Sequence, residues 1–399
     1  MAKVKITGHA SGSGVITVTA PNTSTDRTIT LPDSTGTILD NTSTLDATKL
    51  SGTLPALNGA SLTSVNAVNG GRKNLLINGN MDVWQRGTPI ATMGFGADRW
   101  STYSTNSGVA NYNVTNTQVA DNPISAGGYS YTVAVANADA GIDFITVSQL
   151  IEQSNLTSIN TGDSLTLSFW IKKTRNLDSG ATFKVMAMTP ASSKDTWGAV
   201  TYQATDSLVS TPISENYNSL STSWVKKTAT FTVTANMVTR GLGLCFQIGD
   251  SNVTAGAGST AEIYRFTAVQ LEKGSVATDF EHRSYGEELA LCQRYYCELP
   301  TSYVNAHFSG YLSTFISDPI FFPTTMRTGP TIAVKSGTLR YTYWQYSYMT
   351  DDIPTISARG VTKNRVVPFA IKINGSTATN GSRYTGNAST MILSADAEL

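Results

Sequence analysis

The eight residues Leu165 to Lys172, LTLSFWIK, constrain the fold of this chain more than any other stretch. Four apolar side chains occupy every second position, namely Leu165, Leu167, Phe169 and Ile171. The positions between them hold Thr166, Ser168, Trp170 and Lys172. Successive side chains of a strand point to opposite faces, whereas a helix repeats every 3.6 residues. The period of two therefore predicts a β-strand with one buried face.

Other segments of the same kind lie between Asn74 and Phe280. Several of them alternate apolar and polar residues, and Gly, Asn, Asp or Ser flank them. The segments are Thr182–Met188, Ala229–Ala235, Gly241–Ile248 and Glu262–Leu271. No helical pattern competes with them in this part of the chain. Short antiparallel strands at this spacing predict a β-sandwich of the jelly-roll type over residues 73–283.

One helix is predicted after this sandwich, over residues 284–299. Ser284 and Glu287 have the spacing of a capping box, and Pro300 marks the end. Its apolar face would consist of Tyr285, Leu289, Cys292, Tyr296 and Leu299. Strand signals return in residues 300–399, which we expect to form a C-terminal β domain. The predicted fold is thus mostly β with one linker helix.

Residues 1–72 differ from the rest because they contain no Trp, Tyr or Phe. Such a segment buries little apolar area per residue, so it should not form a free-standing globule. Short alternating pieces between prolines and glycines indicate thin strands, which normally need neighbours from other chains. Single leucines then recur among turn residues, as in a narrow stalk that packs against copies of itself. A disordered linker is the alternative.

The charge and cysteine content limit the possible partners. Lys plus Arg and Asp plus Glu number 28 each, so the net charge is zero, and we expect no nucleic-acid partner. No apolar window of 18 residues predicts membrane insertion, and the first residues lack the apolar core of a signal peptide. We therefore expect synthesis in a cytoplasm. Three cysteines suit neither a disulfide framework nor a four-ligand zinc cluster.

Catalytic motifs do not stand out in the sequence. The three histidines are isolated, and G-x-S-x-G, H-E-x-x-H and the phosphate-binding G-x-x-x-x-G-K-[ST] are absent. We predict that the protein is not an enzyme and uses no cofactor. A glycosidase needs only two suitably spaced acids, however, and acidic residues are too common for the sequence to exclude that alternative.

Aromatic residues on polar strand faces are the candidates for sugar binding. Sugar rings present C–H faces that stack on Trp or Tyr, while amides and hydroxyls pair with the sugar hydroxyls. The candidates are Trp170, Tyr341, Tyr343, Trp344, Tyr346 and Tyr348. Trp170 lies on the polar side of its strand. A second core or a contact between subunits is the alternative role for all of them.

A structural calcium ion is a further hypothesis. Jelly-roll modules can hold calcium through carbonyl and carboxylate oxygens near the chain entry. Suitable hard ligands here are Asn78, Asn80, Asp82 and Glu272. Exposed asparagines also serve in turns, which is the alternative.

Five segments in order carry a resemblance to a known class of proteins. They are NLLINGNMDVWQRG from Asn74, ADRW from Ala97, LTLSFWIK from Leu165, AVQLEKG from Ala268 with Asp279-Phe280-Glu281, and SYGEELALCQRYY from Ser284. Together they closely resemble tail-fibre and receptor-binding proteins of tailed bacteriophages. The resemblance implies a jelly roll like a carbohydrate-binding module, with NLLINGN as first strand and Q-L-E-x-G closing the sandwich. The residues of the first segment also suggest structural roles. Leu75, Leu76 and Ile77 would enter the core, and Asn78-Gly79-Asn80 would turn the chain. Trp84 would cap an edge, and Arg86 would pair with Asp98 or Glu272.

The N-terminal segment ITVTAPNTSTDRTITLPDSTGTILD resembles repeats at the start of structural proteins of marine and cyanobacterial phages. The resemblance implies a homotrimeric fibre in the virion, in which residues 1–72 bind phage tail, baseplate or adaptor proteins. Adsorption to host-surface polysaccharide is the expected function. Two alternatives stay open: a structural virion protein without a receptor role, such as a head fibre or tail adaptor, and a polysaccharide-degrading tailspike.

Overall fold

A computed structural model of the chain describes most of residues 72–398 and only scattered positions before them. The described residues are 11, 24–26, 72–91, 93–106, 109–110, 114–135, 142–177, 181–197, 206–253, 261–300, 304–308, 314–317, 320–336, 341–343, 356–358, 361–366, 369–372, 383–386 and 392–398. The chain divides into two units, Met1–Thr63 and Ser64–Leu399. The predicted stalk therefore lies almost wholly outside the described residues. The described residues form mostly β-strands.

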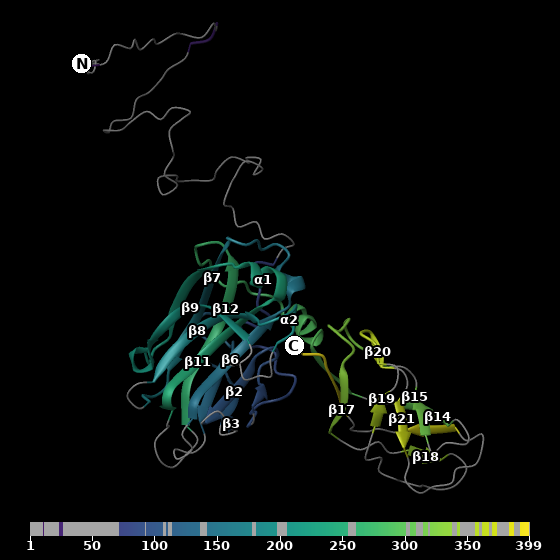
Figure 1. Ribbon diagram of the computed structural model, residues 1–399. Coiled ribbons are helices and arrows are strands. Elements are labelled where there is room, and N and C mark those ends of the chain that lie inside the picture. The colour runs from purple at the N-terminus through teal and green to yellow at the C-terminus, as the bar shows by residue number, and fades with distance from the viewer. Residues whose placement is uncertain are drawn as a thin grey trace. The chain divides into compact units, whose positions relative to one another are not determined.

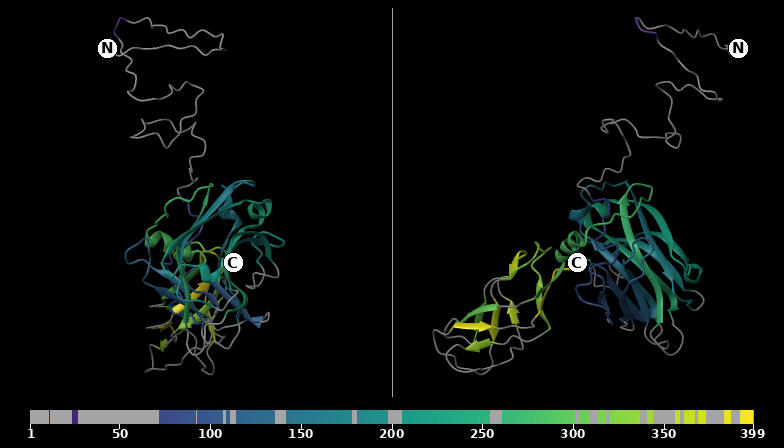
Figure 2. Two further views of the ribbon diagram at one scale, coloured as in Figure 1. Left: turned by 90° about the vertical axis from the view of Figure 1, so that its left-hand side faces the viewer. Right: turned by 180° about the vertical axis from the view of Figure 1, so that it is seen from behind.

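Two antiparallel sheets form the main body (Figures 1 and 2). The seven-stranded sheet has the order β1-β2-β6-β11-β8-β9, with β3 paired to β2. Its strands are β1 (Gly94–Phe95), β2 (Ser101–Asn106), β3 (Val109–Ala110), β6 (Ile142–Ile151), β8 (Thr182–Pro190), β9 (Asp206–Asn216) and β11 (Leu242–Val253). The five-stranded sheet has the order β10-β7-β12-β5-β4. Its strands are β4 (Val114–Val119), β5 (Ser130–Val135), β7 (Ser164–Lys173), β10 (Val225–Thr232) and β12 (Ala261–Lys273).

An aromatic core joins the two sheets. The ring of Phe246 on β11 lies 5.0 Å from Phe169 on β7 and 5.1 Å from Phe266 on β12, measured between centroids. Trp100, at the start of β2, stands edge-on to Phe266 at 5.6 Å. All four side chains are fully buried. The inward residues of both sheets thus build one core, which confirms the prediction of a β-sandwich.

The strand from Leu165 behaves as its alternation predicts. Leu165, Leu167, Phe169 and Ile171 are buried in the core, while Trp170 and Lys172 are half-buried on the other face. The predicted strands from Thr182, Gly241 and Glu262 correspond to β8, β11 and β12. The strand predicted over Ala229–Ala235 is shifted, because β10 ends at Thr232 and Thr234 caps the short helix α1 (Ala235–Arg240).

The segment NLLINGN, Asn74–Asn80, was predicted as the first strand, and this prediction is wrong. These residues follow no regular strand, although the N–H of Leu75 donates to Leu271 O at 2.9 Å. Of the three apolar residues only Leu76 is fully buried. The side chain of Asn74 replaces a ladder partner, because its Oδ1 accepts from the N–H groups of Leu76 and Leu271, both at 3.0 Å.

The predicted helix exists but is shorter than residues 284–299. Helix α2 spans Tyr285–Gln293, and the hydroxyl of Ser284 caps it by accepting from the N–H of Glu287 at 3.3 Å. The residues after it extend into β13 (Tyr296–Pro300), where Tyr296 and Leu299 become buried by sheet pairing. Tyr285, predicted on the apolar face, is 60% exposed. Sheet pairing of Tyr296–Pro300 thus overrides the helical spacing.

The C-terminal part contains three further sheets. A three-stranded sheet pairs β13, β23 (Ile392–Asp396) and β17 (Thr331–Ser336). A two-stranded sheet joins β16 (Ile320–Phe321) to β20 (Arg365–Val366). A six-stranded sheet consists of β18 (Tyr341–Tyr343), β22 (Arg383–Gly386), β14 (Val304–Phe308), β15 (Thr314–Ser317), β21 (Phe369–Lys372) and β19 (Ile356–Ala358). The prediction of a β-rich C-terminal region is confirmed.

Within the described residues, the remaining helical pieces are the 3₁₀ turns η3 (Gln153–Leu156) and η4 (Tyr217–Ser219). Among the residues that the structure describes, no helix has the length and apolarity needed to cross a bilayer.

Candidate carbohydrate-binding face

The outer face of the five-stranded sheet carries two tryptophans. Trp170 on β7 pairs in register with Lys226 on β10, and Val225 pairs with Ile171. Trp224 directly precedes β10, so it lies diagonally across the ladder from Trp170. Diagonal neighbours of this kind stand about 7–8 Å apart, within reach of large rings. The register therefore puts the two half-buried tryptophans on the same sheet face, which we call the tryptophan face, without a ring–ring contact between them.

A network of charged groups fixes the surroundings of Trp224. Asp121 accepts from its indole N–H at 3.0 Å, from Lys172 Nζ at 2.6 Å and from an Arg265 guanidinium N–H at 2.7 Å. The ammonium of Lys172 also lies 4.8 Å from the centre of the Trp224 ring. Glu262 holds the other side of the Arg265 guanidinium at 2.5 Å. The hydrogen bond to Asp121 and the contact with Lys172 thus hold the Trp224 side chain in one position.

Trp170 has a different environment. Among the described residues it makes neither a ring–ring nor a cation–ring contact, although it is half-buried. Its cross-strand neighbours are Lys226 on one side and Thr267 on the other. The hydroxyl of Thr267 is already bound to Tyr129 O at 2.7 Å. A flat apolar ring thus lies beside a rigid set of charged donors and acceptors.

The carboxyl of Asp121 links this network to pH. Burial raises its pKa, but hydrogen bonds from Lys172, Trp224 and Arg265 outweigh burial and lower the pKa to about 2. The ordinary value is 3.8. A carboxyl with a lowered folded-state pKa contributes stability above its unfolded pKa and loses that contribution as the pH falls through the folded value.

We expect the unfolding free energy of the Asp121→Asn variant to fall less between pH 4 and pH 2 than that of the wild type. The wild type should lose about 1–2 kcal/mol of unfolding free energy from this group in that window, after allowance for its partial exposure. Urea denaturation at pH 5 and pH 2.5 measures the difference. A pH response equal in wild type and variant would contradict the assignment. Asp195→Asn, outside the network, is the control.

The aromatic strand predicted as a second binding surface is only partly described. Tyr341–Tyr343 form β18 and pair with β22, where Tyr341 opposes Gly386 and Tyr343 opposes Tyr384. Trp344, Tyr346 and Tyr348 lie outside the described residues. Its role in binding stays a prediction.

The four residues suggested as calcium ligands are engaged by the protein itself. Oδ1 of the fully buried Asn78 accepts from Val83 N at 3.0 Å, and its Nδ2 donates to Val83 O and Asp98 O. Asn80 donates to Asp82 at 3.0 Å, and the pKa of Asp82 is raised mainly by burial. Glu272 instead accepts from Gln270 and Thr278.

These contacts place only Asn80 and Asp82 together. Asn78 and Glu272 belong to separate hydrogen-bond networks. The described contacts bring only two of the four side chains together, and the calcium site stays a prediction. Turn formation, the alternative role, fits Asn78, whose φ is +56°.

The segment Asn74–Gly87 has the structural role that its residues suggested. Arg86 lies 3.9 Å from Asp98, one of its two expected partners, and also contacts Asp396 at 3.2 Å. Trp84 packs on Tyr131 at 5.2 Å and donates its indole N–H to Met81 O at 2.9 Å. The Asn, Trp and Arg side chains of this segment thus hold the fold together.

Sequence reasoning identified Trp170 but missed Trp224, Asp121, Lys172 and Arg265 as its neighbours. Trp224 follows a Ser-rich turn outside any alternating pattern, and Asp121 follows β4 in a loop. No signal in the sequence pointed to Trp224, because the strand predicted after it began only at Ala229. The pairing order β10-β7-β12 brings Trp224, Lys172 and Arg265 together, and Asp121 from the loop after β4 contacts all three.

Comparison with known proteins adds little to this geometry. No family model and no curated protein matches the sequence. Among solved structures, similar chains include the enzymatically active domain of tailspike protein 4 from bacteriophage CBA120, with 14% identity, a TM-score of 0.28, and coverage of 50% of this chain and 21% of that chain.

Two further similar structures have other functions. One is a carbohydrate-binding module of the β-sandwich superfamily, at 12% identity and a TM-score of 0.27 over 48% of this chain and 63% of that chain. The other is a Stig cyclase from Fischerella sp. TAU, at 14% identity and a TM-score of 0.30 over 52% of this chain and 99% of that chain. Likeness at these TM-scores identifies neither the family nor the activity of this chain.

Proposed function

We propose that this protein is a phage fibre protein that attaches to the virion through its N-terminal residues and adsorbs to host-surface glycan through the tryptophan face. The observation that carries the binding role is the half-buried ring of Trp170 beside the locked network of Trp224, Asp121 and Lys172. The five ordered segments that resemble tail-fibre proteins support the virion role.

The chemistry of this face suits a saccharide. A sugar ring can lay its C–H side on an indole while charged and hydroxyl groups beside it exchange hydrogen bonds with the sugar hydroxyls. The ion pairs Lys172–Asp121 and Arg265–Asp121 hold these donors in fixed positions, so less conformational entropy is lost on binding.

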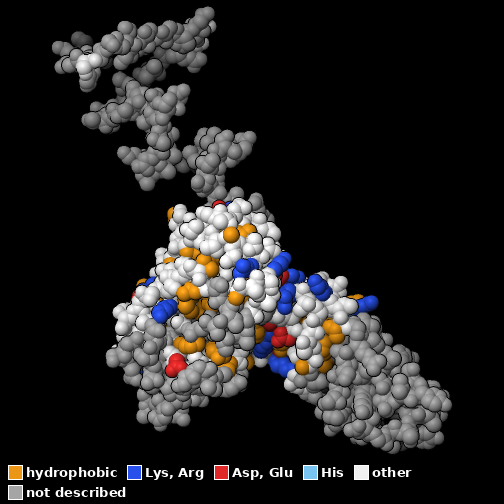
Figure 3. Space-filling model, viewed as in Figure 1, with side chains coloured by type: hydrophobic (Ala, Val, Ile, Leu, Met, Phe, Trp, Pro, Cys, Tyr) orange, Lys and Arg blue, Asp and Glu red, His pale blue; other side chains and the backbone are white. Residues whose placement is uncertain are grey.

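Away from the Asp121 network the chain carries few charged residues, which make up 14% of the sequence. In the face shown in Figure 3, white atoms prevail over the blue and red side chains within the described residues. A surface of this kind limits indiscriminate adhesion to polyanions. Weak affinity for a single sugar would be multiplied in a homotrimeric fibre, where several copies engage one cell together.

We expect Trp170→Ala to weaken glycan binding about tenfold, because one stacked ring is worth roughly 1–1.5 kcal/mol. The test is titration of the full-length protein on arrayed bacterial surface polysaccharides, followed by affinity measurement for the strongest hit. Phe321→Ala is the matched control, since Phe321 is 65% exposed and lies in β16, outside the tryptophan face.

Two outcomes would overturn this function. Absence of binding to any polysaccharide and to host cells would favour a structural virion protein that contacts only other phage proteins. Release of reducing ends from envelope polysaccharide, abolished by a single Asp or Glu substitution, would establish an enzyme.

A further inference from the structure

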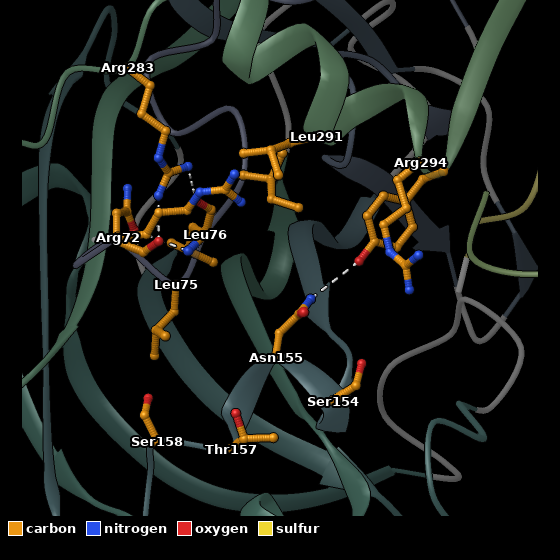
Figure 4. Close-up of a pocket in the computed structure, with 13 residues that line it drawn as sticks. Arg72, Leu75, Leu76, Ser154, Asn155, Thr157, Ser158, Arg283, Leu291 and Arg294 are labelled. Carbon is orange, nitrogen blue, oxygen red and sulfur yellow. Dashed lines mark hydrogen bonds between the residues drawn. The ribbon is translucent and has the colours of Figure 1, made fainter. Parts of the chain in front are cut away.

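A pocket of about 570 Å³ lies apart from the tryptophan face, beside α2 and η3 (Figure 4). Its volume falls within the range of about 300–1,000 Å³ that small-molecule sites occupy. In Figure 4, Arg72 and Arg283 lie on one side of the pocket and Arg294 on another, with Asn155, Thr157 and Ser158 along a third. No residue of the tryptophan face lines it.

The polar lining of the pocket is rich in hydrogen-bond donors. Arg72, Arg283 and Arg294 can only donate, and none of the described residues that line the pocket is Asp or Glu. Ser154, Asn155, Thr157 and Ser158 add hydroxyl and amide groups. Such a lining needs a ligand that is rich in acceptor oxygens.

Glutamates fix the three arginines from outside the pocket. Arg72 pairs with Glu287 at 3.3 Å, and Arg294 pairs with the buried Glu152 at 3.1 Å. Arg283 pairs with Glu281 at 3.0 Å and Glu288 at 3.3 Å. These four carboxylates orient the three guanidinium groups and outnumber them by one, so the preference for an anion must come from the short-range fit of planar guanidinium to oxyanion and not from a net positive charge.

One of these arginines retains an unused donor. The side chain of Arg283 is 5% exposed, and its Nε has no hydrogen-bond partner among the residues that the structure describes. A buried donor without an acceptor costs free energy, so this guanidinium has a hydrogen-bonding capacity that the protein does not satisfy. Its remaining N–H groups are bound, including NH2 to Asn74 O at 2.5 Å.

Apolar side chains complete the pocket. Leu75 and Leu291 line it and offer surface to the C–H groups of a ring. The guanidinium of Arg99 covers one face of the Tyr295 ring at 3.5 Å. The Tyr295 hydroxyl accepts from Asn155 at 3.4 Å. Apolar walls together with hydroxyls, amides and guanidinium groups suit a sugar that bears a charged oxyanion.

We propose that this pocket binds an anionic saccharide unit, with the carboxylate or phosphate at the arginines and the sugar ring against Leu75 and Leu291. The site is separate from the tryptophan face, so it does not depend on the function proposed for that face. Carboxylate and phosphate share the chemistry that the arginines recognise.

Three probes with one common ring test the proposal: D-glucose, D-glucuronate and D-glucose 6-phosphate. Each is titrated into the full-length protein and followed by saturation-transfer NMR. We expect at least one charged probe to bind about five- to tenfold more tightly than glucose, as charge-assisted hydrogen bonds imply. Which of the two binds more tightly identifies carboxylate or phosphate as the oxyanion.

Variants separate this pocket from the rest of the surface. Arg72→Gln combined with Arg294→Gln should abolish the preference for the charged probe, while Arg365→Gln, an exposed arginine outside the pocket, should retain it. Trp170→Ala should also retain the preference for the charged probe. This variant therefore distinguishes a failure of the pocket proposal from a failure of the function proposed for the tryptophan face. Equal binding of all three probes, no binding of any, or an unchanged preference in the double variant would overturn the proposal.

Discussion

Glu398→Ala should destabilise the protein by about 3–5 kcal/mol, because it leaves a buried guanidinium without its counter-ion. Arg99 is 2% exposed, and Glu398 supplies its carboxylate partner through a direct ion pair. The other contacts of this guanidinium are Leu150 O at 2.5 Å and the ring of Tyr295 at 3.5 Å, and neither carries a full negative charge. The charge would therefore stay buried and uncompensated.

The neighbouring Asp396 provides the control. It pairs with Arg86 at 3.2 Å but is 44% exposed, so Asp396→Ala should cost less than about 1 kcal/mol. Chemical denaturation followed by tryptophan fluorescence compares the two variants. Equal stabilities would show that the Arg99–Glu398 pair does not join the C-terminal strand to the sandwich in solution.

Asn78→Asp should destabilise the fold by about 2–4 kcal/mol. The substitution removes two N–H donors and sets a carboxylate against the carbonyl oxygens of Val83 and Asp98 in a fully buried site. Trp100 also depends on this turn, because its indole N–H donates to Asn78 O at 3.0 Å. The unfolding free energy, measured with urea in EDTA, gives the cost.

The same variant tests the calcium hypothesis. If Asn78 were a calcium ligand, an added carboxylate would strengthen calcium binding, and millimolar calcium would restore or raise the stability of the variant. A purely structural Asn78 predicts the same loss with calcium as with EDTA. Asn236→Asp, at an exposed position in α1, should change stability by no more than about 0.5 kcal/mol in either condition.

Local sequence was sufficient where one face of a strand is buried. The alternation from Leu165 fixed which residues enter the core, because a shift by one residue would expose all four of them. The capping box at Ser284 likewise fixed where α2 begins. Sequence spacing failed at the other end of that helix, since Tyr296–Pro300 gains more from pairing with β23 and burying Tyr296 than from another turn of helix.

The candidate site could be predicted only in part. Trp170 was recognisable because an aromatic residue on the polar side of a strand has no local reason to be there. Its partners could not be predicted, because Asp121 and Arg265 are 144 positions apart and meet at 2.7 Å only through sheet order. The arginine pocket has the same origin, since its lining comes from three separate parts of the chain.

The sequence by itself therefore determined that the chain forms a low-charge β-sandwich, because binary alternation is a local property of each strand. The tertiary structure decided everything that depends on contacts between distant residues. It joined Trp224 to Asp121, assigned Asn78 and Glu272 to hydrogen bonds within the fold, and paired Arg99 with Glu398. The physical reason is that charge pairing and hydrogen bonding act over a few ångströms in space, whatever the separation along the chain.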